Sequence, residues 1–196
     1  MLMTRRNLIG SIVAAAAVTP MRVYARSTTH AGIIGAARQA LARHGHAAST
    51  RDLVGVADFS SASSDARFHI VDVVGGTLSS FLVAHGRGSD PSHKGWVERF
   101  SNETGSSATS DGVYLTASEY EGKHGRSMRL KGLDRTNCNA EVRAVVVHGA
   151  WYVSPQMLRD HGKLGRSEGC LAFSEADLPR VLERLGPGRL ITAGKF

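Results

Sequence analysis

The stretch VVVHGAWYVSPQMLRDHGKLGRSEGCLAF, residues 145–173, decides how this sequence is read. It opens on an apolar run that ends at His148-Gly149, and it closes on a polar, glycine-framed turn that leads into Cys170 and a second apolar run. A histidine at the end of one buried strand and a cysteine at the start of another can be adjacent in space, although 22 positions (170 minus 148) separate them. This is the arrangement that a thiol nucleophile and its base require.

The residue types in this stretch suit thiol catalysis. A free thiol has a pKa of about 8.5 and needs a base, a cation or oriented N–H groups to become a thiolate. His148 is the expected general base, and it can return the proton to a leaving amine. Gly169 permits a tight turn, so that the N–H groups of Gly169 and Cys170 point at an oxyanion, while Ser167 holds the shape of the turn. The alternative is that Cys170 is a buried apolar residue or half of a disulfide and His148 a core histidine.

The pattern His148-Gly149, an interval, and then Ser167-x-Gly169-Cys170 resembles the active-site signature of the YkuD-type murein L,D-transpeptidases. Much of the chain is also similar to a divergent proteobacterial branch of that family, over roughly residues 65 to 196. The matching stretches are residues 101–106, 109–114, 122–130 and 145–152. The resemblance implies a mainly β, sandwich-like catalytic domain with an N-terminal and a C-terminal helix, α+β overall.

The resemblance also implies an activity. Members of the family crosslink peptidoglycan stem peptides through a cysteine thioester, so the expected partners are a donor stem and an acceptor stem. Two departures concern the donor contacts: Glu168 stands where the common pattern has histidine, and Ala172 where it has a basic or amide residue. These departures favour 1-3 crosslinks, from L-Ala to meso-diaminopimelate. The alternatives are 3-3 crosslinking, an L,D-peptidase or amidase activity on the same substrate, and a non-catalytic wall-binding module.

Several further residues are candidates for substrate binding. Arg129 can grip a stem-peptide carboxylate, because a guanidinium binds a carboxylate in a bidentate way. Trp151 and Tyr152 follow the expected base and can wall a groove, although large aromatic residues more often belong to the core. Arg166 and Glu168 flank Ser167 and are expected to contact the substrate as well.

Residues 1–25 have the features of an export signal. Arg5-Arg6 precede an apolar stretch, residues 8–18, and small residues at 23–25 have cleavage-site spacing. The order of residues 4–8 resembles a twin-arginine signal, with an ordinary secretory signal as the alternative. The apolar stretch falls short of the roughly 20 residues that cross a bilayer. We therefore expect a periplasmic protein without stable membrane insertion, whose single catalytic domain spans residues 26–196.

Charge and composition narrow the other function classes. Removing residues 1–25 takes away Arg5, Arg6 and Arg22 and no acid, which lowers the net charge from +7 to +4. Basic residues are not interleaved with aromatics, so the sequence gives no support for nucleic-acid binding. No cofactor is expected. A zinc set of three histidines and the cysteine (His124, His148, His161 and Cys170) is the competing catalytic hypothesis, but paired metal-ligand spacings are absent.

The cysteine count leaves a second alternative open. Two cysteines in an exported protein are often a disulfide, here between Cys138 and Cys170. We expect two free thiols, with an occasional bridge that inactivates the enzyme reversibly.

The remaining pattern predicts the elements around the site. Apolar residues at helical spacing predict a helix at 29–44, and a Ser-x-x-Asp capping box with an apolar stripe predicts another from Leu178 to Leu185. The Gly75-Gly76 pair predicts a hairpin. Residues 86–110 lack periodicity and predict a surface loop. Strands are predicted at 53–59, 68–74, 77–84, 114–117, 127–130, 141–147 and 189–192.

Overall fold

The protein is described by a computed structural model over residues 29–196, so the expected export signal at residues 1–25 lies outside the described part. Three α-helices and eight strands follow one another in the described chain, with short 3-10 helices at Gly45–Ala47 and Arg87–Ser89. In chain order they are α1 (His30–His44), β1 (Leu53–Asp58), β2 (Phe68–Asp72), β3 (Thr77–Phe81), β4 (Gly112–Gly122), β5 (Gly125–Gly132), β6 (Val146–Gly149), α2 (Pro155–His161), β7 (Leu171–Phe173), α3 (Leu178–Leu185) and β8 (Leu190–Gly194).

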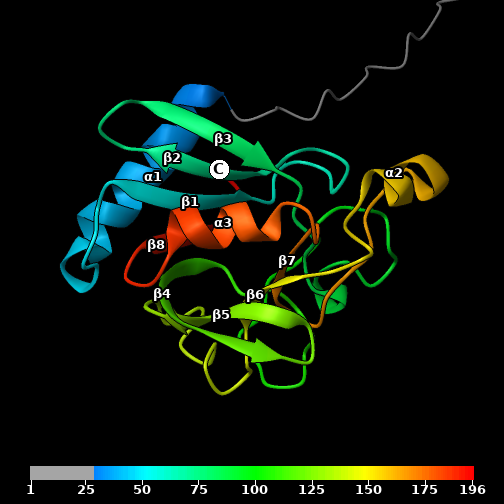
Figure 1. Cartoon of the computed structure of the whole chain (residues 1–196). Coiled ribbons are helices and arrows are strands. Elements are labelled where there is room, and N and C mark those ends of the chain that lie inside the picture. Colours follow the sequence, from blue (N-terminus) through cyan, green and yellow to red (C-terminus); the bar gives the residue numbers. More distant parts are fainter. Residues whose placement is uncertain (1–28) are drawn as a thin grey trace, which may run out of the picture.

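The strands form one sheet in the order β3-β2-β1-β8-β4-β5-β6-β7. Strand β8 lies in the middle, parallel to β1 and antiparallel to β4. The sheet bends, so that β1–β3 and β4–β6 lie on opposite sides of α3 (Figure 1). This arrangement is mainly β with flanking helices, and it confirms the predicted fold class.

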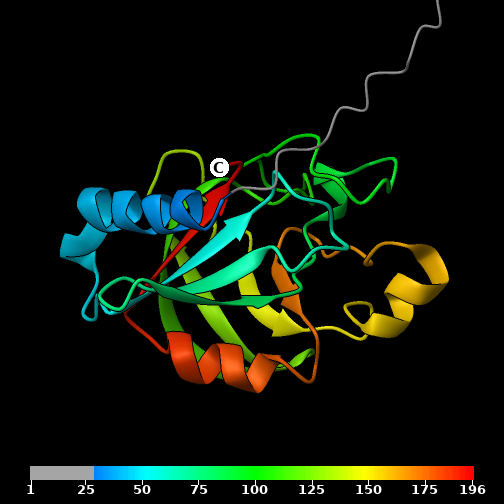
Figure 2. The same cartoon turned by 90° about the horizontal axis from the view of Figure 1, so that it is seen from above.

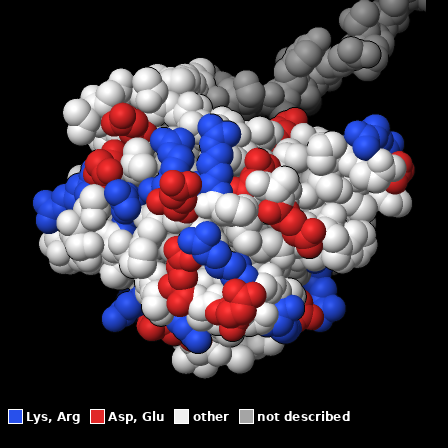
Figure 3. Space-filling model, viewed as in Figure 1, with Lys and Arg blue, Asp and Glu red and all other residues white. Residues whose placement is uncertain are grey.

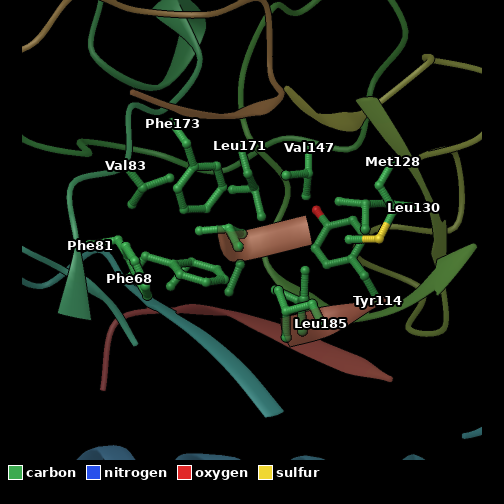
Figure 4. Packing of buried hydrophobic residues seen from close by; sticks show 14 of the residues in the cluster. Phe68, Phe81, Val83, Tyr114, Met128, Leu130, Val147, Leu171, Phe173 and Leu185 are labelled. Atoms are coloured by element: carbon green, nitrogen blue, oxygen red, sulfur yellow. The ribbon is translucent and has the colours of Figure 1, made fainter. Parts of the chain in front are cut away.

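Helices α1 and α3 cover opposite faces of the sheet, as Figure 2 shows. The apolar stripe of α3 is buried against strands from both halves of the sheet, and Figure 4 shows this core, which includes Phe68, Tyr114 and Leu171. Helix α1 packs on the other face through Ile33, Ala37 and their neighbours. Within residues 29–196, no helix has both the length and the apolar character needed to cross a membrane.

The central strands β1 and β8 carry apolar side chains on both faces, and each face is covered by a helix. Successive side chains of a strand point to opposite faces. On β1, Val54 and Val56 face α1, whereas Ala57 belongs to the α3 side. On β8, Leu190 faces α1 and Ile191 faces α3. All five residues are essentially inaccessible to solvent, which is why these strands have no polar alternation in the sequence.

Local signals fix the helix ends. The Thr29 hydroxyl accepts a hydrogen bond from the Gly32 N–H at the start of α1, and the Ser174 hydroxyl accepts one from the Asp177 N–H ahead of α3. Helix α2 was not predicted from the sequence. Its signals are nonetheless present: Ser154 caps it, Pro155 occupies its first turn, and a left-handed glycine follows its last residue.

Two predicted strands differ most in their bounds from the structure, while the others differ by three residues or fewer at either end. Residues 141–144 form a turn instead of the start of β6, and Ala144 takes a left-handed conformation with φ of 52°. Strand β4 is longer than predicted. A register shift between Thr116 and Glu119 breaks the alternation of apolar and polar residues, so the sequence pattern did not indicate the second half of the strand. The hairpin at Gly75-Gly76 is confirmed between β2 and β3, although only Gly76 has a positive φ.

Charges are mixed on the face of the molecule shown in Figure 3. Lys and Arg side chains alternate there with Asp and Glu, so that face carries no large patch of a single sign. This matches the modest net charge calculated for the chain without residues 1–25.

Because β8 joins the two halves of the sheet, we expect its core residues to be sensitive to truncation. Ile191→Ala should lower the free energy of unfolding by about 2–5 kcal/mol, the usual cost of removing a large buried side chain. Val74→Ala is the control: Val74 is 89% exposed in the β2–β3 turn, and its truncation should change the stability by less than about 0.5 kcal/mol. Urea unfolding measures both variants, and equal values for the two would contradict a central role for β8.

Candidate active site

The expected nucleophile and the expected base come from neighbouring parallel strands. Strand β6 pairs with β7 so that His148 lies beside Ala172, the second residue after Cys170. His148 and Cys170 both line one cavity of about 520 Å³. The other walls are the loop at residues 104–107, the β4–β5 hairpin tip and the turn at 166–168. The fold therefore brings together the two side chains that the sequence singled out.

The imidazole of His148 is buried, with 2% of the residue exposed. Its Nδ1 donates a hydrogen bond to the Gly149 carbonyl over 2.8 Å, and since a carbonyl only accepts, Nδ1 carries the proton and Nε2 has a free lone pair. Burial lowers the pKa of His148, and the charges of His124 and Lys123 act in the same direction. The ring of His124 stacks on that of His148, with 4.3 Å between centroids. His148 is thus held neutral and ready to accept a proton.

The thiol of Cys170 is held in its protonated form. Burial raises the pKa of Cys170, which outweighs the opposite effects of the Val146 N–H and of the cations Lys123 and Arg143. The sulfhydryl lies 3.7 Å from the Ala144 carbonyl oxygen, the acceptor for its proton. Both shifts favour an uncharged thiol–imidazole pair over a resting thiolate–imidazolium pair. A reaction at this thiol would therefore have to include loss of its proton.

The turn before the cysteine is held by Ser167. Its hydroxyl donates to the Cys170 carbonyl over 2.7 Å and accepts from the Gly169 N–H over 3.2 Å. Gly169 has φ of 117°, and a Cβ there would meet the Ala108 carbonyl oxygen at 2.8 Å. One expectation is therefore wrong: the Gly169 N–H is bonded within the turn and does not point at an oxyanion. The Cys170 N–H is the remaining backbone donor of this pair.

Tyr152, Arg166 and Glu168, three of the residues expected to contact substrate, line the cavity. Burial raises the pKa of Tyr152 to about 12, and the nearby Cys170 and Glu168 act in the same direction. Arg166 donates to the backbone carbonyl of Asp90. Glu168 is largely exposed and forms an ion pair of 3.1 Å with Arg87 at the rim.

Two predicted substrate residues are not brought to the cavity. Arg129 belongs to β5, and its guanidinium lies over the ring of Tyr120, 4.3 Å from the centroid. Trp151 is 71% exposed and contacts Tyr152 edge-on instead of walling the cavity. Arg129 pairs with Val146 and lies on the same sheet face as His148, but its guanidinium packs on Tyr120. Trp151 follows the end of β6, in a turn that leaves its side chain exposed.

The structure adds a cavity residue that sequence reasoning missed. Arg143, in the turn before β6, donates to the Ser101 carbonyl (2.8 Å), to the Ser110 hydroxyl (2.5 Å) and to the Ala108 carbonyl. It thereby ties residues 101–110 to the cavity wall while placing a positive charge near Cys170. The sequence did offer a signal for Arg143, because it lies just before the apolar run that forms β6. A charged residue beside a buried strand needs polar partners or solvent.

The sequence of this domain is similar to that of a known protein family. A family model described as the L,D-transpeptidase catalytic domain matches residues 27–193. The chain belongs to that family. No curated protein sequence matches this L,D-transpeptidase family member.

Solved structures similar to this L,D-transpeptidase family member include three with that name. An L,D-transpeptidase from Mycobacterium smegmatis is 15% identical with a TM-score of 0.45, covering 73% of this chain and 58% of that one. L,D-transpeptidase 3 from Mycobacterium tuberculosis, with a faropenem-derived adduct, is 15% identical with a TM-score of 0.47, covering 74% and 60%. One from Xylanimonas cellulosilytica is 16% identical with a TM-score of 0.41, covering 72% and 60%.

The chain thus spans about three fifths of the length of these structures. The identities and TM-scores are low, so the assignment to the family rests on the sequence match.

The competing zinc hypothesis finds no geometric support in this L,D-transpeptidase family member. His124, His148 and Cys170 line the cavity, but His161 does not. Among residues 29–196, no three His, Cys, Asp or Glu side chains are grouped to hold a metal ion. Cys138 and Cys170 are both free thiols, and Cys138 lies outside the cavity wall in contact with Asn102.

The burial of His148 predicts that the folded protein loses stability at acidic pH. Because the pKa of folded His148 lies below the ordinary value of 6.5, the unfolded chain binds more protons than the folded one as the pH falls from about 7 to 5. Stability should therefore be full above pH 7 and decline with falling pH, by up to about 1.4 kcal/mol per pH unit for one histidine.

Urea unfolding at pH 7, 6 and 5 measures this slope. We expect a shallower slope in His148→Asn than in the unchanged chain. His161→Asn is the control, since it makes the same replacement at an exposed position of α2. Equal slopes in all three chains would contradict a neutral, buried His148.

Proposed function

We propose that this protein is a peptidoglycan L,D-transpeptidase that works through a thioester on Cys170. The observation that supports it most is the meeting of Cys170 and a neutral His148 at one cavity, in a chain of the L,D-transpeptidase family. The substrates are a donor stem peptide, cut after an L-residue, and an acceptor stem that carries a free amine. The proposed location is the periplasm, on the basis of the signal-like sequence at residues 1–25.

The first half-reaction forms the acyl-enzyme. Nε2 of His148 takes the Sγ proton as Cys170 attacks the carbonyl carbon of the L-residue, and the carbonyl oxygen becomes an oxyanion near the Cys170 N–H. When the C–N bond breaks, His148 gives the proton to the departing D-residue amine. The product is a thioester between Cys170 and the shortened donor stem.

The second half-reaction transfers the acyl group. The acceptor amine, the side-chain amine of meso-diaminopimelate, attacks the thioester carbonyl and loses a proton to His148. The C–S bond breaks, and the proton returns to Sγ. Water in place of the amine gives hydrolysis, so the ratio of crosslinking to cleavage depends on how well the cavity admits the acceptor.

We propose further that the crosslinks are of the 1-3 type. Ala172 stands where the common family pattern has a basic or amide side chain, and it is buried among apolar neighbours. Position 172 therefore offers no polar group to the donor stem. Glu168 places a negative charge at the rim where the pattern has histidine. Both differences change the donor contacts that accompany 3-3 crosslinking, which is the alternative.

The thioester predicts a defined effect of replacing each cysteine. Incubation with muropeptide donor should add an acyl mass to Cys170 in the unchanged protein and in Cys138→Ser, whereas Cys170→Ser should carry no thioester. His148→Gln should form the adduct about 10²- to 10⁴-fold more slowly, the usual contribution of a general base. Intact-mass spectrometry measures the adduct.

The same spectra test the non-catalytic alternative. A Cys138–Cys170 bridge in every molecule before any reductant is added would support a wall-binding module and contradict the thioester mechanism. Loss of the adduct in Cys138→Ser as well as in Cys170→Ser would also contradict the assigned nucleophile.

Muropeptide analysis distinguishes the crosslink types. After incubation of wall sacculi with the protein, a 1-3 enzyme gives dimers in which the donor stem keeps only its first residue, and a 3-3 enzyme gives dimers in which it keeps three. We expect the first product, and none with Cys170→Ser. Shortened monomers without new dimers would identify a hydrolase and overturn the transferase assignment.

A further inference from the structure

Three polar side chains lie in a row inside the protein, behind the cysteine turn and away from the cavity. Arg67, His85 and Asp90 have exposed fractions of 1%, 1% and 0%. Nη2 of Arg67 lies 2.6 Å from Nδ1 of His85, and Nε2 of His85 lies 3.5 Å from Oδ2 of Asp90. None of the three lines the active-site cavity.

The position of the proton on His85 follows from its two neighbours, Arg67 and Asp90. A guanidinium only donates, so Nδ1 of His85 accepts from Arg67 and Nε2 carries the proton toward Asp90. Burial, together with the Arg67 charge, lowers the pKa of His85 and keeps it neutral. The Nε2 group has no hydrogen-bond partner within normal geometry, because 3.5 Å to Asp90 is long. The row thus holds one positive and one negative charge, separated by a neutral ring.

Such an arrangement is a costly way to fill space. Burying charged groups is unfavourable, and apolar side chains of similar volume often stabilise a protein as well or better. A buried polar atom without a partner adds to the cost. The row therefore calls for a role other than stability, and its connections show where that role lies.

The row holds the chain segment that supports the cysteine turn. Arg67 donates to the Val83 carbonyl through Nε (3.2 Å) and Nη2 (3.1 Å). Asp90 accepts from the Lys94 and Gly95 N–H groups, each at 2.8 Å. The Arg67 bonds fix the chain directly before residues 84–87, which we call the supporting segment. The Asp90 bonds fix a side chain three positions after it.

The supporting segment contacts the chain on both sides of Cys170. The Ser167 N–H donates to the His85 carbonyl (2.9 Å), and the Arg87 N–H donates to the Ser167 carbonyl (2.8 Å). Beyond the cysteine, the Ala84 N–H donates to the Ala172 carbonyl (2.9 Å).

Gly86 also lies directly against the turn. A Cβ at Gly86 would come within 2.7 Å of the Gly169 backbone. A shift of the supporting segment would therefore move the turn that carries the thiol.

We propose that Arg67, His85 and Asp90 act together as positioning residues, which fix the supporting segment and, through it, the place of the Cys170 sulfur relative to His148. This inference rests on the proposed thiol mechanism. A misplacement of reacting atoms by about 1 Å can lower a rate by about 10²-fold without a comparable loss of binding. The row would thus affect the chemical step although it touches no substrate.

The test separates positioning from stability. His85→Phe keeps a ring but removes both polar contacts, and His85→Asn keeps an acceptor near the Nδ1 position for Arg67. Val56→Ala is the control, because Val56 is buried on β1 under α1, on the opposite face of the sheet. We expect kcat for transpeptidation to fall at least 10-fold in His85→Phe with KM within about 3-fold, and to recover at least 3-fold in His85→Asn.

Val56→Ala should keep the kcat of the unchanged chain even where it lowers the Tm as much as His85→Phe does. If His85→Phe does not fold, His85→Gln replaces it, since its amide reaches toward Asp90 but leaves Arg67 without the Nδ1 acceptor. A kcat loss in the His85 variants no larger than that in Val56→Ala would overturn the proposal.

A second measurement needs no peptidoglycan. In a Cys138→Ser background, the pH dependence of Cys170 alkylation by iodoacetamide reports how readily the thiolate forms. Burial raises the pKa of this thiol, the Val146 N–H, Lys123 and Arg143 lower it, and Glu168 raises it. His148 and Tyr152 are the titratable groups that share its cavity. Replacement of the neutral His85 alters none of these charges. The hydrogen bond from the Val146 N–H lowers the pKa of Cys170. If the turn moves, this bond is lost, and the midpoint of alkylation should rise by at least about half a pH unit.

The two readouts separate the two proposals. A raised alkylation midpoint in a protein that makes no acyl adduct and no dimers would leave positioning intact and overturn the transpeptidase function. Normal crosslinking, with an unchanged midpoint and an unchanged kcat in the His85 variants, would overturn the positioning role and leave the transpeptidase function intact.

Discussion

The parallel pairing of β6 with β7 is the constraint on which the site depends. Two adjacent parallel strands cannot be joined by a tight turn and need a crossover. Here the crossover is residues 150–170, which contain α2 and the cysteine turn. The pairing fixes His148 on one strand and places Cys170 where the next strand begins. The supporting segment bonds to the chain on both sides of Cys170, and Arg143 ties residues 101–110 to the same cavity wall.

The electrostatic design of the site favours a resting enzyme without charge on its reacting atoms. Burial acts in opposite senses on an acid and a base, raising the pKa of Cys170 and lowering that of His148. A neutral thiol is a poor target for oxidation and for metal ions, both of which act on thiolates. Under the proposed thiol mechanism, proton transfer then has to accompany the attack. A precisely held donor–acceptor geometry then matters more than it would for a preformed thiolate, which gives the buried row behind the turn its importance.

Sequence reasoning reached the core of the site because its signals were local. The glycines around Ser167 and the apolar runs beside His148 and Cys170 are short patterns with direct structural meaning. It failed where side-chain direction depends on distant pairing. Arg129 shares a sheet face with His148, but its guanidinium packs on Tyr120 of the neighbouring strand, a contact that the sequence does not state. Arg143 and Ser110 are 33 positions apart, and Arg67 lies 18 positions from His85, so these contacts form only once distant parts of the chain have come together.

The position of β8 has a consequence for how the molecule is made. A ribosome releases the chain from its N-terminal end, so β1–β3 and β4–β7 are available before residues 190–194 have been added. Until then the two halves of the sheet have no shared strand, and the interior filled by Ile191 and α3 stays open to solvent. The addition of β8 therefore closes the core against water, and a product truncated before residue 190 is exposed to proteolysis and aggregation.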